Sequence, residues 1–105
     1  MPPERIAQLT AILEQEPRNT LARYAIGIEY ASANEVDLAL DAFRQVLEID
    51  PNYVNAYAMA TQMLSDAGRE TEAIEWLGKG IACAEQAGNH HAADKMQSLL
   101  DEINR

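Results

Sequence analysis

The chain has 105 residues, which is enough for one small domain with a single elongated core but too few for two. Hydrophobic residues make up 48% of the chain and charged residues 24%, as is usual for a folded soluble protein. The 17 acidic and 8 basic residues give a formal net charge of −9, so the basic stripe that nucleic-acid binding requires is missing. This charge also disfavours anionic membranes, whereas a basic or apolar peptide partner is compatible with it.

Cysteine usage and the N-terminal sequence bear on the compartment. Cys83 is the single cysteine, so no internal disulfide can form and nothing indicates an oxidising compartment. The N-terminal sequence Met-Pro-Pro-Glu-Arg lacks a basic region followed by an apolar run, and no stretch reaches the length of a membrane span. We therefore expect a cytoplasmic protein that binds neither nucleic acid nor membrane.

Apolar residues recur at helical spacing in six segments, which predicts six helices. The first segment begins at prolines, which suit the first turn of a helix, and stops before Pro17. The predicted helices span residues 3–16, 20–33, 36–49, 53–67, 70–87 and 90–104.

Helix ends are predicted from the residues that flank these segments. Asn19 and Asn89 are predicted N-caps, because a side-chain oxygen at this position accepts an unpaired backbone N–H of the first turn. Asn34 and Gly68 stand where a residue in the left-handed conformation ends a helix. The two are 34 residues apart, and this agreement supports both assignments.

Three glycines lie inside predicted helices rather than at their ends. Gly27 falls in the second helix, and Gly78 and Gly80 fall in the fifth. Glycine costs a helix interior about 1 kcal/mol relative to alanine. We therefore expect a neighbouring helix to pack closely over each of these positions.

The sequence also repeats with a period of 34 residues, which is typical of a helical solenoid. Pro17 and Pro51 are separated by this distance, and each ends an apolar run. When the sequence is compared with itself at an offset of 34 residues, similar residues align: Ala22 with Ala56, Tyr30 with Leu64, Ala39 with Ala73, Phe43 with Leu77 and Leu47 with Ile81.

These residues resemble the tetratricopeptide repeat (TPR). Its pattern has an apolar-glycine pair and then an aromatic in the first helix, a small residue and then an aromatic in the second, and a proline at the boundary. Residues 20–53 supply Ile26-Gly27, Tyr30, Ala39, Phe43 and Pro51, and residues 54–87 supply Tyr57, Ala60, Leu64, Ala73 and Leu77. Arg23 departs from the pattern, since a tryptophan or another large residue is usual there, and Glu85 replaces the second boundary proline.

The resemblance implies an all-α fold, a right-handed α-solenoid of antiparallel helix pairs with about six helices. Residues 1–105 would form a single TPR-like domain. Within it, residues 3–16 correspond to the second half of a repeat, residues 20–53 and 54–87 are two repeats, and residues 89–104 are a C-terminal capping helix. Solenoids need such a terminal element with one polar side.

The resemblance also implies a function, a non-enzymatic scaffold that binds a peptide or helix of another protein. In this family the first helix of each repeat lines a concave groove. Leu21 and Ile28 are also compatible with packing inside the domain, because amphipathic stripes are more often core than site. By position, the groove would be lined by Leu21, Tyr24, Ile28, Ser32, Asn55, Ala58, Gln62, Asp66, Asn89, Ala92 and Met96.

One TPR subgroup grips the C-terminal carboxylate of heat-shock chaperones with basic and amide residues. In this chain Tyr24, Ile28 and Met59 stand at corresponding positions and supply no cation. The groove is therefore better suited to an apolar or mixed segment, docked as anchors in pockets.

Two other hypotheses remain open. The helix at residues 3–16 leaves an apolar face that a second copy could cover, which would give a two-fold homodimer through terminal helices. A metal site is a remote alternative, because His90 and His91 point about 100° apart on a helix and cannot easily bind one ion. His90 and Asp94 are the better pair, but a zinc site needs three or four ligands. With no nucleophile and base pair and no phosphate-binding glycine loop evident, we expect no enzymatic activity and no cofactor.

Overall fold

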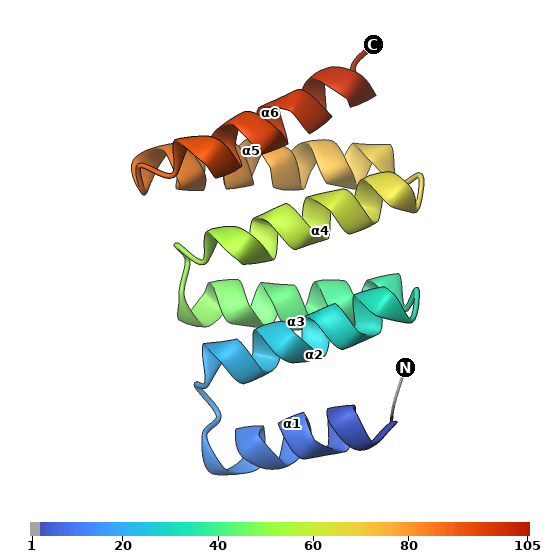
Figure 1. The fold of residues 1–105 in the computed structure, drawn as a ribbon, viewed down its shortest axis with the longest axis vertical. Helices are drawn as coiled ribbons and strands as arrows, with labels where there is room; N and C mark the ends of the chain where they lie inside the picture. The colour runs from blue at the N-terminus through green and yellow to red at the C-terminus, as the bar shows by residue number, and fades with distance from the viewer. Residues whose placement is uncertain (1–2) are drawn as a thin grey trace. The chain divides into compact units, whose positions relative to one another are not determined.

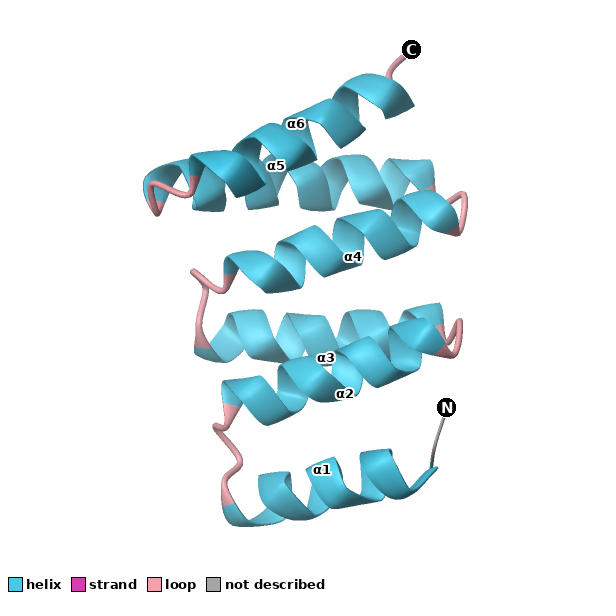
Figure 2. Cartoon of the chain, in the orientation of Figure 1, coloured by secondary structure: helices cyan, strands magenta, loops and turns pink. Residues whose placement is uncertain are grey.

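The computed structural model describes residues 3–105, and within them the chain forms six α-helices joined by short turns (Figure 1, Figure 2). Each helix begins and ends within one residue of its predicted bounds, and the predicted all-α fold is confirmed. The helices are α1 (Pro3–Gln15), α2 (Thr20–Ser32), α3 (Val36–Ile49), α4 (Val54–Asp66), α5 (Glu70–Gln86) and α6 (His90–Ile103).

The chain divides into two compact units, the first ending at Pro51 and the second starting at Asn52. The first unit contains α1, α2 and α3, and the second contains α4, α5 and α6. The boundary lies at Pro51, and a proline disfavours the helical conformation in the residue before it. Asp50 accordingly leaves α3 with extended dihedral angles, φ −132° and ψ 92°. The assignment of residues 1–105 to one domain stays a prediction.

Two of the helices begin with the predicted asparagine caps. The side-chain oxygen of Asn19 accepts the backbone N–H of Ala22 at 3.0 Å, and that of Asn89 accepts the N–H of Ala92 at 3.1 Å. Each bond satisfies one of the N–H groups that a helix start leaves without a partner. Both predicted caps are confirmed.

The helices α2, α4 and α5 end in the same left-handed turn, at Asn34 (φ 60°), Gly68 (φ 74°) and Gly88 (φ 72°). After α4, the N–H of Gly68 bonds to the carbonyl of Ser65 and the N–H of Arg69 bonds to that of Leu64. This pair of bonds is the Schellman motif, which satisfies the last carbonyls of a helix. The predicted left-handed ends at Asn34 and Gly68 are confirmed.

In the first unit, the fully buried apolar residues lie mainly on α3, and Phe43 is the largest of them. A Cβ at Gly27 of α2 would lie 2.5 Å from Cε1 of the Phe43 ring. Glycine therefore lets the ring rest against the backbone of α2, and the predicted close approach at Gly27 is confirmed.

Helix α1 packs against α2, and Arg5 reaches Glu29 in an exposed ion pair of 3.1 Å. Of the described side chains of α1, only Leu9 is buried. Ile12, in the same helix, is 39% exposed. The apolar face that the sequence leaves open on this helix therefore includes Ile12.

The second unit is built around a buried cluster of α5 and α6 residues, into which Tyr57 of α4 also packs. A Cβ at Gly80 would lie 2.8 Å from both the Met96 sulfur and the Tyr57 Cβ, so α5 approaches its two neighbours closely there. Gly78 is exposed with nothing within 4 Å of such a Cβ, and the prediction of close packing over Gly78 is wrong. Two residues turn a helix by about 200°, so Gly78 faces solvent when Gly80 faces the core.

Burial along α6 is narrower than its apolar pattern predicts. Ala93 and Met96 are buried, whereas Leu99, Leu100 and Ile103 are only half-buried. The expectation that all five are buried is therefore wrong for the last three, because α4 and α5 leave part of the α6 surface open. None of the helices within residues 3–105 is long and apolar enough to cross a membrane.

Candidate functional site

Helices α4 and α6 form the two walls of a groove of about 320 Å³ in the second unit, here named the α4–α6 groove. The two helices run in the same direction, and α5 lies behind them in the opposite direction (Figure 1). The groove is lined by Asn55, Ala58, Met59, Thr61 and Gln62 from α4, and by Asn89, His91, Ala92, Lys95, Met96 and Leu99 from α6 and its cap.

Helical spacing places the side chains of each wall. On α4, Asn55, Met59 and Gln62 follow at four and three residues, so they share one face of the helix. Along this wall an amide side chain is therefore followed by an apolar one and then by a second amide. Met59 is 37% exposed and presents the apolar part of the wall.

The α6 wall has a different order. His91, Lys95 and Leu99 follow at intervals of four residues and therefore form a second stripe. Because α4 and α6 run in the same direction, His91 lies at the Asn55 end of the groove and Leu99 at the Gln62 end. One end of the groove is therefore polar and basic, and the other is more apolar.

The floor of the groove is apolar and has no unsatisfied polar group in the described part. Met96 is only 3% exposed and lies against the backbone of α5 at Gly80. Thr61 is 1% exposed, and its hydroxyl donates to the carbonyl of Ala58 at 3.0 Å, which offsets the cost of its burial.

Behind the floor, Tyr57 packs edge-on against Trp76, with 6.0 Å between the ring centroids and 67° between the planes. Burial raises the pKa of the Tyr57 hydroxyl, and the nearby Cys83 raises this pKa further. The phenol therefore keeps its proton to a higher pH than an ordinary tyrosine.

The structure brings together the groove positions predicted for the second repeat and the last helix. Six of them line the α4–α6 groove: Asn55, Ala58, Gln62, Asn89, Ala92 and Met96. Asp66 does not line it, but it accepts a hydrogen bond of 3.0 Å from Gln62. That these residues bind a partner stays a prediction.

Five lining residues were absent from the predicted groove: Met59, Thr61, His91, Lys95 and Leu99. The spacing of His91, Lys95 and Leu99 at every fourth residue is a signal from which their shared face could have been found. For Met59, the corresponding signal is its position four residues after Asn55.

The predicted positions in the first unit are placed differently. Leu21 is 67% exposed, so the alternative that it packs inside the domain is wrong. Ile28 is half-buried, and Ser32 is exposed. The half-buried Tyr24 ring lies 5.9 Å from the ring of Phe43, so it contributes to packing.

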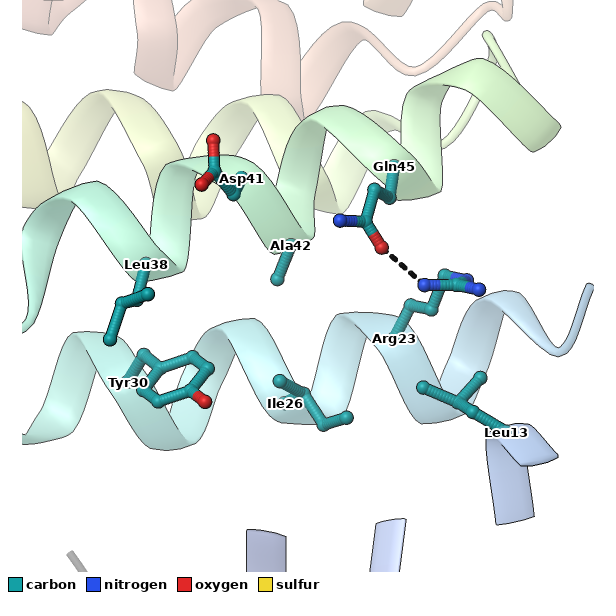
Figure 3. Close-up of a pocket in the computed structure, with 8 residues that line it drawn as sticks. All are labelled: Leu13, Arg23, Ile26, Tyr30, Leu38, Asp41, Ala42 and Gln45. Carbon is teal, nitrogen blue, oxygen red and sulfur yellow. Dashed lines mark hydrogen bonds between the residues drawn. The ribbon is translucent and has the colours of Figure 1, made fainter. Parts of the chain in front are cut away.

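A separate pocket of about 230 Å³ in the first unit lies between α2 and α3, near the end of α1 (Figure 3). At one end Arg23 donates to the Pro17 carbonyl from Nε at 3.1 Å and from Nη2 at 2.9 Å, and its Nη1 donates to Gln45. Arg23, which departs from the TPR pattern, thus ties the α1–α2 turn to α3. The pocket is lined by Leu13, Arg23, Ile26, Tyr30, Leu38, Asp41, Ala42 and Gln45.

The candidate metal ligands on α6 are exposed at the surface. His90, His91 and Asp94 all lie on its first two turns. In the range 3–105, no group of three or more His, Cys, Asp and Glu side chains is arranged to hold a metal ion.

In comparisons by sequence, no family model and no curated protein matches the chain. Solved structures, by contrast, match most of its length. A protein from Bordetella parapertussis is 29% identical, with a TM-score of 0.82, over 95% of this chain and 87% of its own. A TPR domain protein from Salinibacter ruber is 25% identical, with a TM-score of 0.73, over 83% of this chain and 88% of its own.

The TPR2B domain of yeast Sti1, solved in a complex with pHsp70, has a TM-score of 0.83 at 17% identity, over 94% of this chain and 79% of its own. At that identity the match concerns the fold alone. The resemblance found in the sequence and the matches found in the structure agree. The chain therefore has the fold of the tetratricopeptide-repeat proteins.

Proposed function

We propose that the protein is a non-enzymatic interaction module that holds a segment of another protein in the α4–α6 groove. The observation that carries this proposal is the convergence of positions such as Asn55, Gln62 and Ala92 on one groove. The repeat pattern alone predicts these positions.

The chemistry of the groove favours an extended segment. Its volume of about 320 Å³ is at the lower end of the range for ligand pockets, so it suits one or two side chains rather than a whole helix. Asn55 and Gln62 lie seven residues apart, about 10 Å along α4. Their amides can donate to and accept from the main chain of the segment while an apolar side chain enters between them.

The solved TPR domains support this proposal. The TPR2B domain of Sti1 was solved in a complex with pHsp70, and the TPR2AB domain of the same protein in a complex with pHSP90. Both matches have 17% sequence identity and concern the fold, so the proposal extends to binding a segment of another protein and not to these partners.

The test is a screen of displayed random nonapeptides against the purified protein and two variants. Ala58→Arg places a long charged side chain in the groove at a half-buried position, and Ala82→Arg makes the same change at an exposed α5 position outside it. We expect the wild type and Ala82→Arg to select the same peptides and Ala58→Arg to select none, at unchanged helicity by circular dichroism. Selection by Ala58→Arg of the wild-type peptides would overturn the proposal.

A homodimer through terminal helices is the second candidate function. Ile12 of α1 is 39% exposed, and Leu38 of α3 in the same unit is 46% exposed, so this unit presents apolar surface that a second copy would bury. Light scattering at several concentrations tests it. We expect a dimer mass that Ile12→Glu converts to a monomer mass, and a monomer at all concentrations would reject this candidate.

A further inference from the structure

We propose that the segment held in the α4–α6 groove carries an Asp or Glu side chain near an apolar anchor. The carboxylate lies at the end with His91 and Lys95, and the anchor lies toward Leu99. The inference rests on the proposed function, because it specifies the chemistry of the segment that the same groove holds.

The first argument is the charge of the lining. Although the chain has 17 acidic residues against 8 basic ones, no Asp or Glu lines the groove. Its charged or chargeable side chains are Lys95 and His91, which are one turn apart on α6. The local charge of the groove is therefore opposite in sign to that of the whole protein.

The nearby carboxylates give the groove a direction. Asp66 follows Gln62 at the far end of α4 and accepts its hydrogen bond, so negative charge lies at the end away from Asn55 and His91. Asp94, next to Lys95 in the sequence, is exposed and does not line the groove. A carboxylate of the bound segment is thus favoured at the basic end and repelled at the other.

The helix ends add to this asymmetry. The N-termini of α4, at Val54, and of α6, at His90, both lie at the end of the groove that contains Asn55 and His91. Each helix N-terminus carries a partial positive charge, which favours an anion within about one turn. The C-terminus of the antiparallel α5 lies at the same end, and its partial negative charge offsets part of this effect. Met59 in the middle of the groove and Leu99 toward the opposite end provide the apolar surface for the anchor.

The net charge of −9 does not cancel this preference. At physiological ionic strength the Debye length is about 8 Å, so exposed charges farther away are largely screened. Lys95 contacts a bound segment directly and is screened less. A single exposed ion pair of this kind changes affinity by about twofold to fivefold.

The test uses three nonapeptides with a central leucine flanked by Glu, Gln or Lys, each acetylated and amidated so that the only carboxylates are side chains. Binding is measured by fluorescence anisotropy at 150 mM salt. We expect the Glu peptide to bind about threefold tighter than the Gln peptide, and the Lys peptide to bind most weakly. Lys95→Glu should reverse this order, whereas Lys79→Glu, the same charge change at an exposed α5 position outside the groove, should preserve it.

The outcomes separate the inference from the proposed function. Equal binding of the three peptides, tightest binding of the Lys peptide, or an unchanged order in Lys95→Glu would overturn the acidic preference. If none of the three amidated peptides binds but the same sequences with a free C-terminus do, the terminal carboxylate is the recognised group and the inference is wrong. In each of these cases loss of binding in Ala58→Arg still supports the groove as the site, whereas binding retained in Ala58→Arg contradicts the proposed function itself.

Discussion

Glycine at two helix-interior positions of this chain has opposite effects on stability relative to alanine. At Gly27 the space for a Cβ is filled by the ring of Phe43, which is fully buried. At Gly78 the space is open and faces solvent. The conformational cost of glycine is the same at both positions. The surroundings therefore decide whether glycine or alanine gives the more stable protein there.

We expect Gly27→Ala to destabilise the protein and Gly78→Ala to stabilise it. Alanine improves the helix by up to about 1 kcal/mol at each position, but at Gly27 a Cβ lies 2.5 Å from Phe43, and overpacking costs typically 1–3 kcal/mol. Urea denaturation measures both changes, and Gly78→Ala is the matched control for helix propensity. A Gly27→Ala variant as stable as Gly78→Ala would show that the Phe43 ring moves at little cost.

The raised pKa of Tyr57 predicts a loss of stability in alkaline solution. Because the folded state holds the phenol proton more tightly than the unfolded state, the stability is fully present below the ordinary tyrosine pKa of about 10 and falls as the pH rises through the raised value. We expect the unfolding free energy to fall more steeply above pH 10 in the wild type than in Tyr57→Phe, which keeps the ring. Parallel curves from denaturant titrations at pH 8 to 11 would contradict this assignment.

At the scale of the helices, the side chain of Arg23 links the turn between α1 and α2 to α3. Arg23 donates twice to the carbonyl of Pro17 and once to Gln45 on α3. A bifurcated guanidinium of this kind has no equivalent in a lysine ammonium. The residue that departs from the repeat pattern has therefore a structural role in the first unit.

We expect Arg23→Ala to lower the unfolding free energy by about 1–2 kcal/mol, because it removes these hydrogen bonds, which are partly exposed. Arg23→Lys should recover only part of the loss. Arg18→Ala, an exposed arginine in the same turn, serves as the control and should change stability by less than about 0.5 kcal/mol. Equal effects of the Arg23 and Arg18 substitutions would mean that the bonds to Pro17 contribute nothing.

The elements were predictable where their causes are local. Caps such as Asn19, left-handed turns such as Asn34 and breaks such as Pro51 depend on a few neighbouring residues, so the sequence sufficed to place the helix ends within one residue. Packing over Gly78 was not predictable from residue type, since the same residue two positions later is buried.

The groove was predicted in part, and the missing part has a physical cause. Helix α5 has 17 residues where α3 has 14, so α6 starts at His90, 36 residues after α4 starts at Val54. A strict period of 34 therefore misplaces the α6 wall by two residues. By helix position His91 corresponds to Asn55, and the repeat comparison overlooked His91 for this reason.

At the scale of the whole molecule, the net charge and the groove have separate consequences. The formal charge of −9 acts over distances comparable to the Debye length and opposes compaction through mutual repulsion. It gives no information on which segment the groove holds, because Lys95 and His91 determine the local potential there. The overall charge is instead expected to control how stability responds to salt.

We expect the melting temperature at pH 7 to rise by about 2–4 °C between 10 and 300 mM NaCl, which corresponds to roughly 0.5 kcal/mol of screened repulsion. Screening also weakens attractive pairs such as Arg5 with Glu29, but that pair is largely exposed and contributes little. Near the isoelectric point of about 4.5 the net charge vanishes, so the rise with salt should shrink there. A melting temperature at pH 7 that falls with salt would show that the attractive pairs outweigh the repulsion, since screening acts on both and its net sign reports the larger of the two.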